Sequence, residues 1–164
     1  MTTNHIDVER FSVTSSKSFE DVVADLEAAV GHPDMDAFQR DIVTTKTYAE
    51  LENVIHRAIG SSGLMEFTRF DFGEILRKGR GGEAPKSLRL VVGNPLIMKQ
   101  MVELVQDAGS YAPVTILVDE RSDGVHLSYD RMASFLTPYG SPGALEVAQD
   151  LDSKVEALLT AAAT

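Results

Sequence analysis

Apolar residues between Leu88 and Tyr129 change their spacing in a way that predicts a strand followed by a helix. The run Leu88–Val92 is short and β-rich, and Gly93-Asn94-Pro95 stops it. From Leu96 onward, apolar residues recur at helical spacing until Gly109. Proline suits the first turn of a helix because its fixed φ is already helical. We therefore expect an amphipathic helix that begins directly after the strand.

Two apolar runs after this helix predict a β-hairpin. Val114–Asp119 and Val125–Tyr129 each have the length of a strand, and the polar loop Glu120–Gly124 joins them. The Asp-Gly pair in this loop is a strong hairpin signal because glycine tolerates the positive φ that such turns need. The two runs are expected to pair as antiparallel neighbours.

The rest of the chain predicts four more helical segments and two more strands. Ser18 and Thr47 each precede an apolar stripe and carry an acid three residues later, which indicates two capped helices. A phase change in the second of these strands suggests a bulge near Thr68-Arg69, or a strand that is covered on both faces. The segments are a strand over 8–14, a helix over 19–31, helices over 34–46 and 48–60, a strand over 64–72, and a long helix over 143–163.

Together these elements predict a single α+β domain over residues 1–164. Its antiparallel or mixed sheet would have four to five strands with helices packed on it, in the order β-α-(helical insert)-β-β-α-β-β-α. The helices within residues 32–62 form the insertion. After the strand that ends at Phe72, Ile75 and Leu76 indicate one helical turn, and the basic segment Arg77–Gly82 is expected to be a solvated, flexible loop, with phosphate contact as the alternative.

Composition excludes several classes of protein. The chain contains no cysteine, so disulfides, thiolate metal sites and cysteine nucleophiles are ruled out. Its net charge is −10, from 25 acidic against 15 basic residues, which opposes binding to nucleic acid. There is no signal-peptide pattern and no apolar run long enough to span a membrane, so we expect a cytoplasmic protein without a membrane partner.

The order of elements, with VVGNPLIMKQM, SYAPVTILVDE and GVHLSYDRM, resembles the bacterial family called domain of unknown function 302. The correspondence covers Ser12–Gly31 and Leu64–Leu159, and residues 32–62 resemble an addition relative to the shortest members. The resemblance implies a fold similar to that of the TATA-binding protein, with helices on one face of an antiparallel sheet, commonly in a homodimer. It implies no established activity.

Three residues are candidates for acid-base chemistry: Asp71, His126 and Tyr129. Asp71 lies between two aromatic residues, although strand neighbours point away from it, and a solvated acid is the alternative. His126 projects from the strand face opposite Val125 and Leu127, where it would accept a proton, bind haem iron or simply face solvent. The histidines lack the spacing of a metal site, so no bound metal ion is expected. No cofactor is expected either, and haem is the one alternative.

Five residues are candidates for ligand contacts: Asn94, Met98, Met101, Tyr111 and Tyr129. Asn94 lies where a strand turns into a helix, and it either offers an amide to a ligand or caps the helix. The methionines and tyrosines would line a pocket between sheet and helices or belong to an ordinary core.

The sequence therefore favours a small non-catalytic protein that binds a small, partly apolar ligand or a protein partner. The alternative is a cofactor-independent acid-base enzyme or a haem protein that uses a pocket between sheet and helix. A homodimer that pairs through a sheet face or edge is the expected assembly. The usual phosphate, dinucleotide and hydrolase motifs are absent from the sequence.

Overall fold

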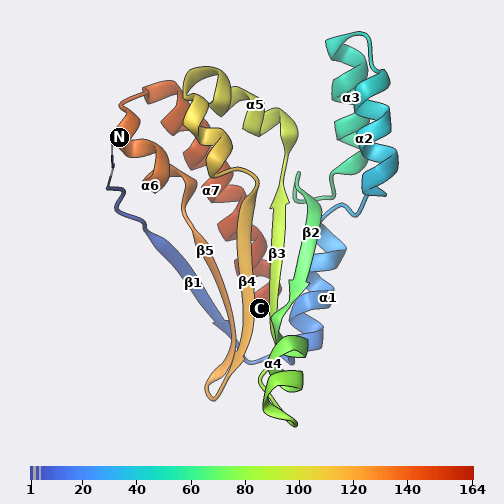
Figure 1. Cartoon of the computed structure of the whole chain (residues 1–164), viewed down its shortest axis with the longest axis vertical. Helices are drawn as coiled ribbons and strands as arrows, with labels where there is room; N and C mark the ends of the chain where they lie inside the picture. Colours follow the sequence, from blue (N-terminus) through green and yellow to red (C-terminus); the bar gives the residue numbers. More distant parts are fainter. Residues whose placement is uncertain (2, 4) are drawn as a thin grey trace.

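A single antiparallel sheet organises the molecule (Figure 1). The computed structural model describes residues 1, 3 and 5–164. The sheet has five strands in the order β1-β5-β4-β3-β2, which confirms the predicted α+β class and shows that every pairing is antiparallel. The strands are β1 (Arg10–Ser15), β2 (Met65–Asp71), β3 (Ser87–Gly93), β4 (Val114–Arg121) and β5 (Gly124–Asp130).

Helices cover one face of this sheet. Figure 1 shows the long helix α7 (Pro142–Ala163) behind the sheet, where it contacts α1 (Phe19–Ala29), α5 (Pro95–Leu104) and α6 (Met132–Leu136). Strand alternation explains the core, because Val114, Ile116 and Val118 of β4 are buried under the helices while Thr115, Leu117 and Asp119 point the other way. In the described part of the chain, no helix lies across the opposite face of β1, β5, β4 and β3, which we call the open face.

The predicted helix caps are confirmed. The Ser18 and Thr47 hydroxyls accept hydrogen bonds from Asp21 N and Glu50 N at 3.1 and 3.2 Å. Asn94 caps α5, since its Oδ1 accepts from Leu96 N at 2.9 Å. These side chains satisfy backbone donors that have no partner within the first turn of a helix.

The helices α2 (Met35–Thr44) and α3 (Tyr48–Ala58) form a small second core with the start of β2 (Figure 1). The backbones at the ends of α1 and α3 meet at Gly31 and Gly60, whose N–H groups both donate to the carbonyl oxygen of Leu64 at 2.9 Å. A Cβ atom on Gly31 would lie 1.9 Å from the carbonyl oxygen of Ala58. Glycine is therefore required here for close backbone approach.

The prediction of a flexible basic loop was wrong, because Phe72–Arg80 forms helix α4. Asp71 caps this helix by accepting from Glu74 N at 2.8 Å. Glu74 pairs with Arg77 at 2.6 Å and with Lys78 at 3.3 Å, and pairs at these spacings favour a helix. The helix ends at Gly81, whose positive φ of 69° forms a left-handed cap.

One helix end and two short helices differ from the predictions. Helix α5 ends at Leu104, and the 3-10 helix η1 (Gln106–Ser110) fills the segment up to Gly109 that was expected to be helical. Helix α6 and the 3-10 helix η2 (Thr137–Tyr139) were not predicted. The bulge in β2 lies between Glu66 and Thr68, close to the expected position.

Among the described residues, no helix has both the length and the apolar character that a membrane span requires.

Candidate functional site

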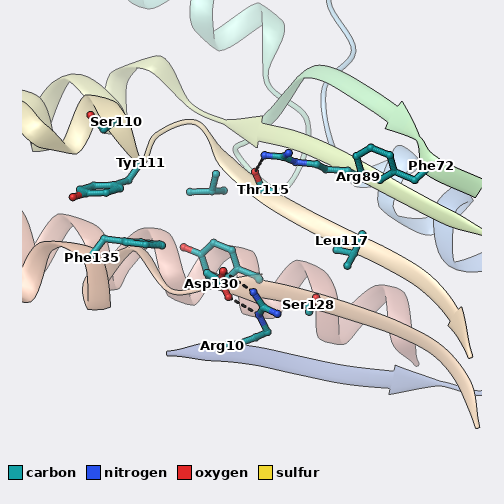
Figure 2. Close-up of a pocket in the computed structure, with 12 residues that line it drawn as sticks. Arg10, Phe72, Arg89, Ser110, Tyr111, Thr115, Leu117, Ser128, Asp130 and Phe135 are labelled. Carbon is teal, nitrogen blue, oxygen red and sulfur yellow. Dashed lines mark hydrogen bonds and ion pairs between the residues drawn. The ribbon is translucent and has the colours of Figure 1, made fainter. Parts of the chain in front are cut away.

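A hollow of about 440 Å³ lies along the open face, above strands β4 and β5 (Figure 2). Its volume is within the range of sites that hold small molecules. Its walls come from β1, β3, β4, β5, the first residue of α4 and the residues around η1 and α6. The lining residues are Arg10, Phe72, Arg89, Ser110, Tyr111, Val114, Thr115, Leu117, Ser128, Tyr129, Asp130 and Phe135.

Arg10 and Asp130 form an ion pair at one side of this hollow (Figure 2). They lie directly opposite each other in the β1–β5 register. The Arg10 guanidinium donates to both carboxylate oxygens, with distances of 2.6 and 2.9 Å. Hydrogen bonding to Asp130 raises the pKa of Arg10 above its ordinary value. The charge of this arginine is therefore already matched by a carboxylate.

Arg89 is different because its guanidinium has no carboxylate partner among the described residues. It projects from β3 across the open face, and its Nη2 donates to the Thr115 hydroxyl at 3.2 Å (Figure 2). Phe70 lies opposite it in β2 and Leu117 in β4, so its surroundings in the sheet are largely apolar. A guanidinium presents five N–H donors, and the Thr115 bond uses only one.

Aromatic rings form the end of the hollow nearest η1 and α6 (Figure 2). The rings of Tyr111 and Phe135 stack with centroids 4.8 Å apart and planes 13° apart. The Tyr111 hydroxyl lies 2.9 Å from that of Tyr139, and this hydrogen bond raises the pKa of Tyr139 above its ordinary value. The end wall of the hollow is thus a fixed aromatic surface, and the Tyr111 hydroxyl on it is already hydrogen-bonded to Tyr139.

Tyr129 reaches one wall of the hollow but is almost completely buried. Its hydroxyl donates to Asp152 Oδ1 at 2.5 Å, and Met132 N and Ala133 N donate to the same carboxylate at 2.7 and 3.1 Å. Burial raises the pKa of Tyr129 far above its ordinary value and also raises the pKa of Asp152. This cluster caps α6 and thereby positions Phe135.

The structure does not bring the three acid-base candidates together. Asp71 caps α4, while Tyr129 faces the helix layer, and His126 projects from the open face. His126 Nε2 lies 2.8 Å from Asp123 Oδ1, and its Nδ1 lies 3.5 Å from the Thr14 hydroxyl, so both ring nitrogens have protein partners. His126 lines neither the hollow nor the cavity described next. Within the described residues, no group of three or more His, Asp or Glu side chains has a metal-binding arrangement.

A second, smaller cavity of about 70 Å³ lies between α5 and the end of the sheet. Its lining is almost entirely apolar, and it includes the bulged residue Phe67 and the predicted candidates Asn94, Met98 and Met101. The amide of Asn94 is engaged on both sides, since its Nδ2 donates to the carbonyl oxygen of Gly63 at 2.9 Å and its oxygen caps α5. This cavity has room for a few carbon atoms but not for a cofactor.

The five ligand-contact candidates therefore separate into two groups. Tyr111 and Tyr129 line the hollow, while Asn94 and the two methionines line the small cavity, and Val114 borders both. Sequence reasoning missed the two arginines of the hollow, Arg10 and Arg89. A signal was present at Arg89, because it interrupts the apolar run of β3 as its outward-facing residue.

Comparison with known proteins places the chain in a family. The family model described as "Domain of unknown function DUF302" matches residues 40–162, more than half of the chain. The chain belongs to the DUF302 family. The resemblance expected from the sequence is thus confirmed, and the match includes most of the α2–α3 segment.

A crystal structure of an uncharacterized conserved DUF302 protein from Bacillus stearothermophilus has the same fold. The TM-score is 0.65, with 14% sequence identity, and the similarity covers 93% of this chain and 97% of that chain. No curated protein matches the sequence. DUF302 membership therefore establishes the fold, and an argument about function has to start from the open face.

Proposed function

We propose that this DUF302 protein is a non-catalytic binding protein whose hollow takes a small, partly apolar ligand with an anionic group. The observation that carries the proposal is the Arg89 guanidinium, which projects from β3 between Phe70 and Leu117 of the flanking strands and has only the Thr115 hydroxyl as a partner among the described residues. The planar fork of an arginine matches the two oxygens of a carboxylate, sulfonate or phosphate.

The apolar part of the ligand has a complementary surface in the same hollow. Leu117 provides the floor, and the stacked rings of Tyr111 and Phe135 form one end. An aromatic or branched aliphatic group placed there would lose contact with water while its anionic group reached Arg89. We therefore expect ligands such as aromatic acids to bind better than inorganic anions alone.

The side chains around the hollow favour binding over proton transfer. General acid-base catalysis needs a group of suitable pKa within hydrogen-bond reach of the substrate. The Tyr129 phenol is buried against Asp152, and the Tyr111 and Tyr139 hydroxyls bond each other. Asp130 is held by Arg10. No cofactor enters the proposal.

A fluorescent aromatic sulfonate, 8-anilinonaphthalene-1-sulfonate, tests this proposal by titration. The Arg89→Ala variant is expected to bind the probe at least about tenfold more weakly, because a charge-assisted hydrogen bond contributes roughly 1.5–3 kcal/mol. Arg40→Ala is the matched control, since Arg40 is exposed on α2 and outside the hollow. Equal probe affinity in the two variants would overturn the proposal. Native mass spectrometry of the freshly purified protein would identify a co-purified anion.

We also propose that the chain acts as a homodimer in the cytoplasm. Support for the dimer comes from exposed apolar side chains that gather on one segment, Phe70–Leu76, a concentration that soluble monomers rarely show. Sedimentation equilibrium tests the assembly, and cell fractionation tests the location. A single monomeric species at all protein concentrations would refute the dimer.

A further inference from the structure

Four exposed apolar side chains lie together at helix α4 and the end of strand β2 that precedes it. Phe70, Phe72, Ile75 and Leu76 have exposed fractions of 47, 36, 65 and 40%. The rings of Phe70 and Phe72 stack with centroids 6.3 Å apart, so they form one continuous surface. Figure 1 shows α4 at one end of the molecule, opposite the end with α2 and α3. A partner that covers this helix would therefore not collide with the helix layer.

The apolar residues of α4 follow one stripe of the helix. Phe72, Ile75, Leu76 and Gly79 recur at i, i+3, i+4 and i+7, which places them on the same face. Gly73 lies on another face, which packs against the sheet, because a Cβ there would come within 3.0 Å of Ser87 N. A Cβ on Gly79 would meet nothing within 4 Å. The stripe thus has a bulky aromatic ring at its first position and an open gap at its last.

This stripe is complementary to itself when two copies of α4 run antiparallel. A two-fold axis between Ile75 and Leu76 would place Phe72 of one copy opposite the partner subunit's Gly79, so that a ring fills a gap. The same axis would bring Ile75 against the partner subunit's Leu76. A parallel arrangement would instead oppose two Phe72 rings and leave two gaps.

The charges beside the stripe favour the same orientation. Asp71 and Lys78 are seven residues apart, so they flank the stripe on the same side of the helix, and their side chains are 59 and 78% exposed. Antiparallel pairing brings Asp71 near the partner subunit's Lys78, twice by symmetry. Parallel pairing would place these two side chains on opposite sides of the interface, where they could not pair.

From this complementarity we infer that a second copy of the chain docks on α4, with the two α4 helices antiparallel across a two-fold axis. The inference rests on the proposed homodimer and specifies its interface. A two-fold contact uses the same surface on both subunits, as this stripe does. A nine-residue helix pair buries less than the roughly 1,200 Å² of a stable interface, so the dimer is weak and dissociates on dilution.

Because the natural chain has no cysteine, single cysteine variants map the pairing without background. Ile75→Cys places a thiol close to the axis, and mild oxidation is expected to link two copies through it. Residue 80 lies four to five positions from the axis, so two Arg80→Cys thiols would be about 13 Å apart along the helices, too far for a disulfide. Val43→Cys, on the exposed side of α2, is the control for random collision.

The outcomes separate this interface from dimer formation in general. The expected result is efficient linking of the Ile75→Cys variant, while the Arg80→Cys and Val43→Cys variants stay unlinked. If the Ile75→Cys variant is a dimer in sedimentation but does not link on oxidation, the α4 interface is overturned and the homodimer still stands. Efficient linking of both the Ile75→Cys and the Arg80→Cys variants would overturn the antiparallel order.

A second measurement uses the gap at Gly79. Gly79→Phe is expected to weaken the dimer at least about tenfold in sedimentation, because two rings then compete for one space, while the open position keeps the monomer folded. An unchanged dissociation constant would contradict the interface. Wild-type protein that stays monomeric but co-sediments with phosphatidylserine vesicles would overturn the inference and show that the chain binds a lipid surface instead of a second copy.

Discussion

The buried carboxylate of Asp152 gives the sharpest prediction about how the hollow is supported. It accepts hydrogen bonds from the Tyr129 hydroxyl, Met132 N and Ala133 N at 2.5, 2.7 and 3.1 Å. Asp152→Ala would leave the Tyr129 hydroxyl and Ala133 N without this acceptor, and Met132 N with only the Tyr129 oxygen at 3.1 Å. Helix α6 would lose its carboxylate cap. Phe135 belongs to α6, so the aromatic end of the hollow would lose its support.

The magnitude follows from two opposing effects. Each buried donor that loses its acceptor typically costs about 1–3 kcal/mol, and relief from burying the carboxylate offsets part of this. We expect Asp152→Ala to lower the free energy of unfolding by about 3 kcal/mol, which is roughly 6–12 °C in Tm for a chain of this size. Thermal unfolding followed by circular dichroism measures it.

Asp150→Ala is the control, because Asp150 is exposed and lies two residues away on the same helix. Its Tm is expected to stay within about 2 °C of the wild type, as for most surface substitutions. Equal Tm values for the two alanine variants would refute the argument that Asp152 anchors α6.

The remaining predictions concern pH, a glycine contact and the ion pair of the hollow. Burial raises the pKa of Asp152 above its ordinary 3.8, so the folded protein binds this proton more tightly than the unfolded chain does. The stability of the wild type relative to Asp152→Asn should therefore fall as pH rises from about 3.8 through the folded pKa. An opposite slope in urea titrations would contradict this prediction. Gly31→Ala should lower the free energy of unfolding by at least about 3 kcal/mol in the same assay, because its Cβ would overlap a carbonyl oxygen. Gly82→Ala, whose Cβ would meet nothing within 4 Å, should lower it by less than about 0.5 kcal/mol. Similar losses in the two variants would show that the close backbone approach at Gly31 is unimportant. Asp130→Asn should strengthen binding of the aromatic sulfonate several-fold, because it frees the Arg10 guanidinium. Arg10→Ala should weaken binding, because the Asp130 carboxylate then has no cation beside it. Wild-type affinity of both variants in fluorescence titration would refute this prediction.

Local sequence patterns predicted most of the fold because the patterns themselves cause the elements. The caps at Ser18 and Thr47 and the Asp-Gly turn of the β4–β5 hairpin act through neighbours within a few residues, so the chain displays them directly. Helix α6 could not be predicted in the same way. Its cap is Asp152, about twenty residues further along the chain, and only the packed α7 helix brings it there.

The same distinction explains why the candidate site was only partly predicted. Arg10 and Asp130 are 120 residues apart and meet only because β1 pairs with β5. Arg89 was available from alternation in β3, but its lack of a carboxylate partner among the described residues depends on the neighbouring strands. Tyr111 was identified as aromatic lining, while its stacking on Phe135 required the unpredicted α6.

The most direct test of ligand binding on the open face is an amide NMR titration with 8-anilinonaphthalene-1-sulfonate. We predict that the largest shift changes occur at Arg89, Thr115, Leu117 and Ser128, which lie together in the hollow. Shift changes confined to the small apolar cavity around Met98, or no saturable changes at all, would contradict the account.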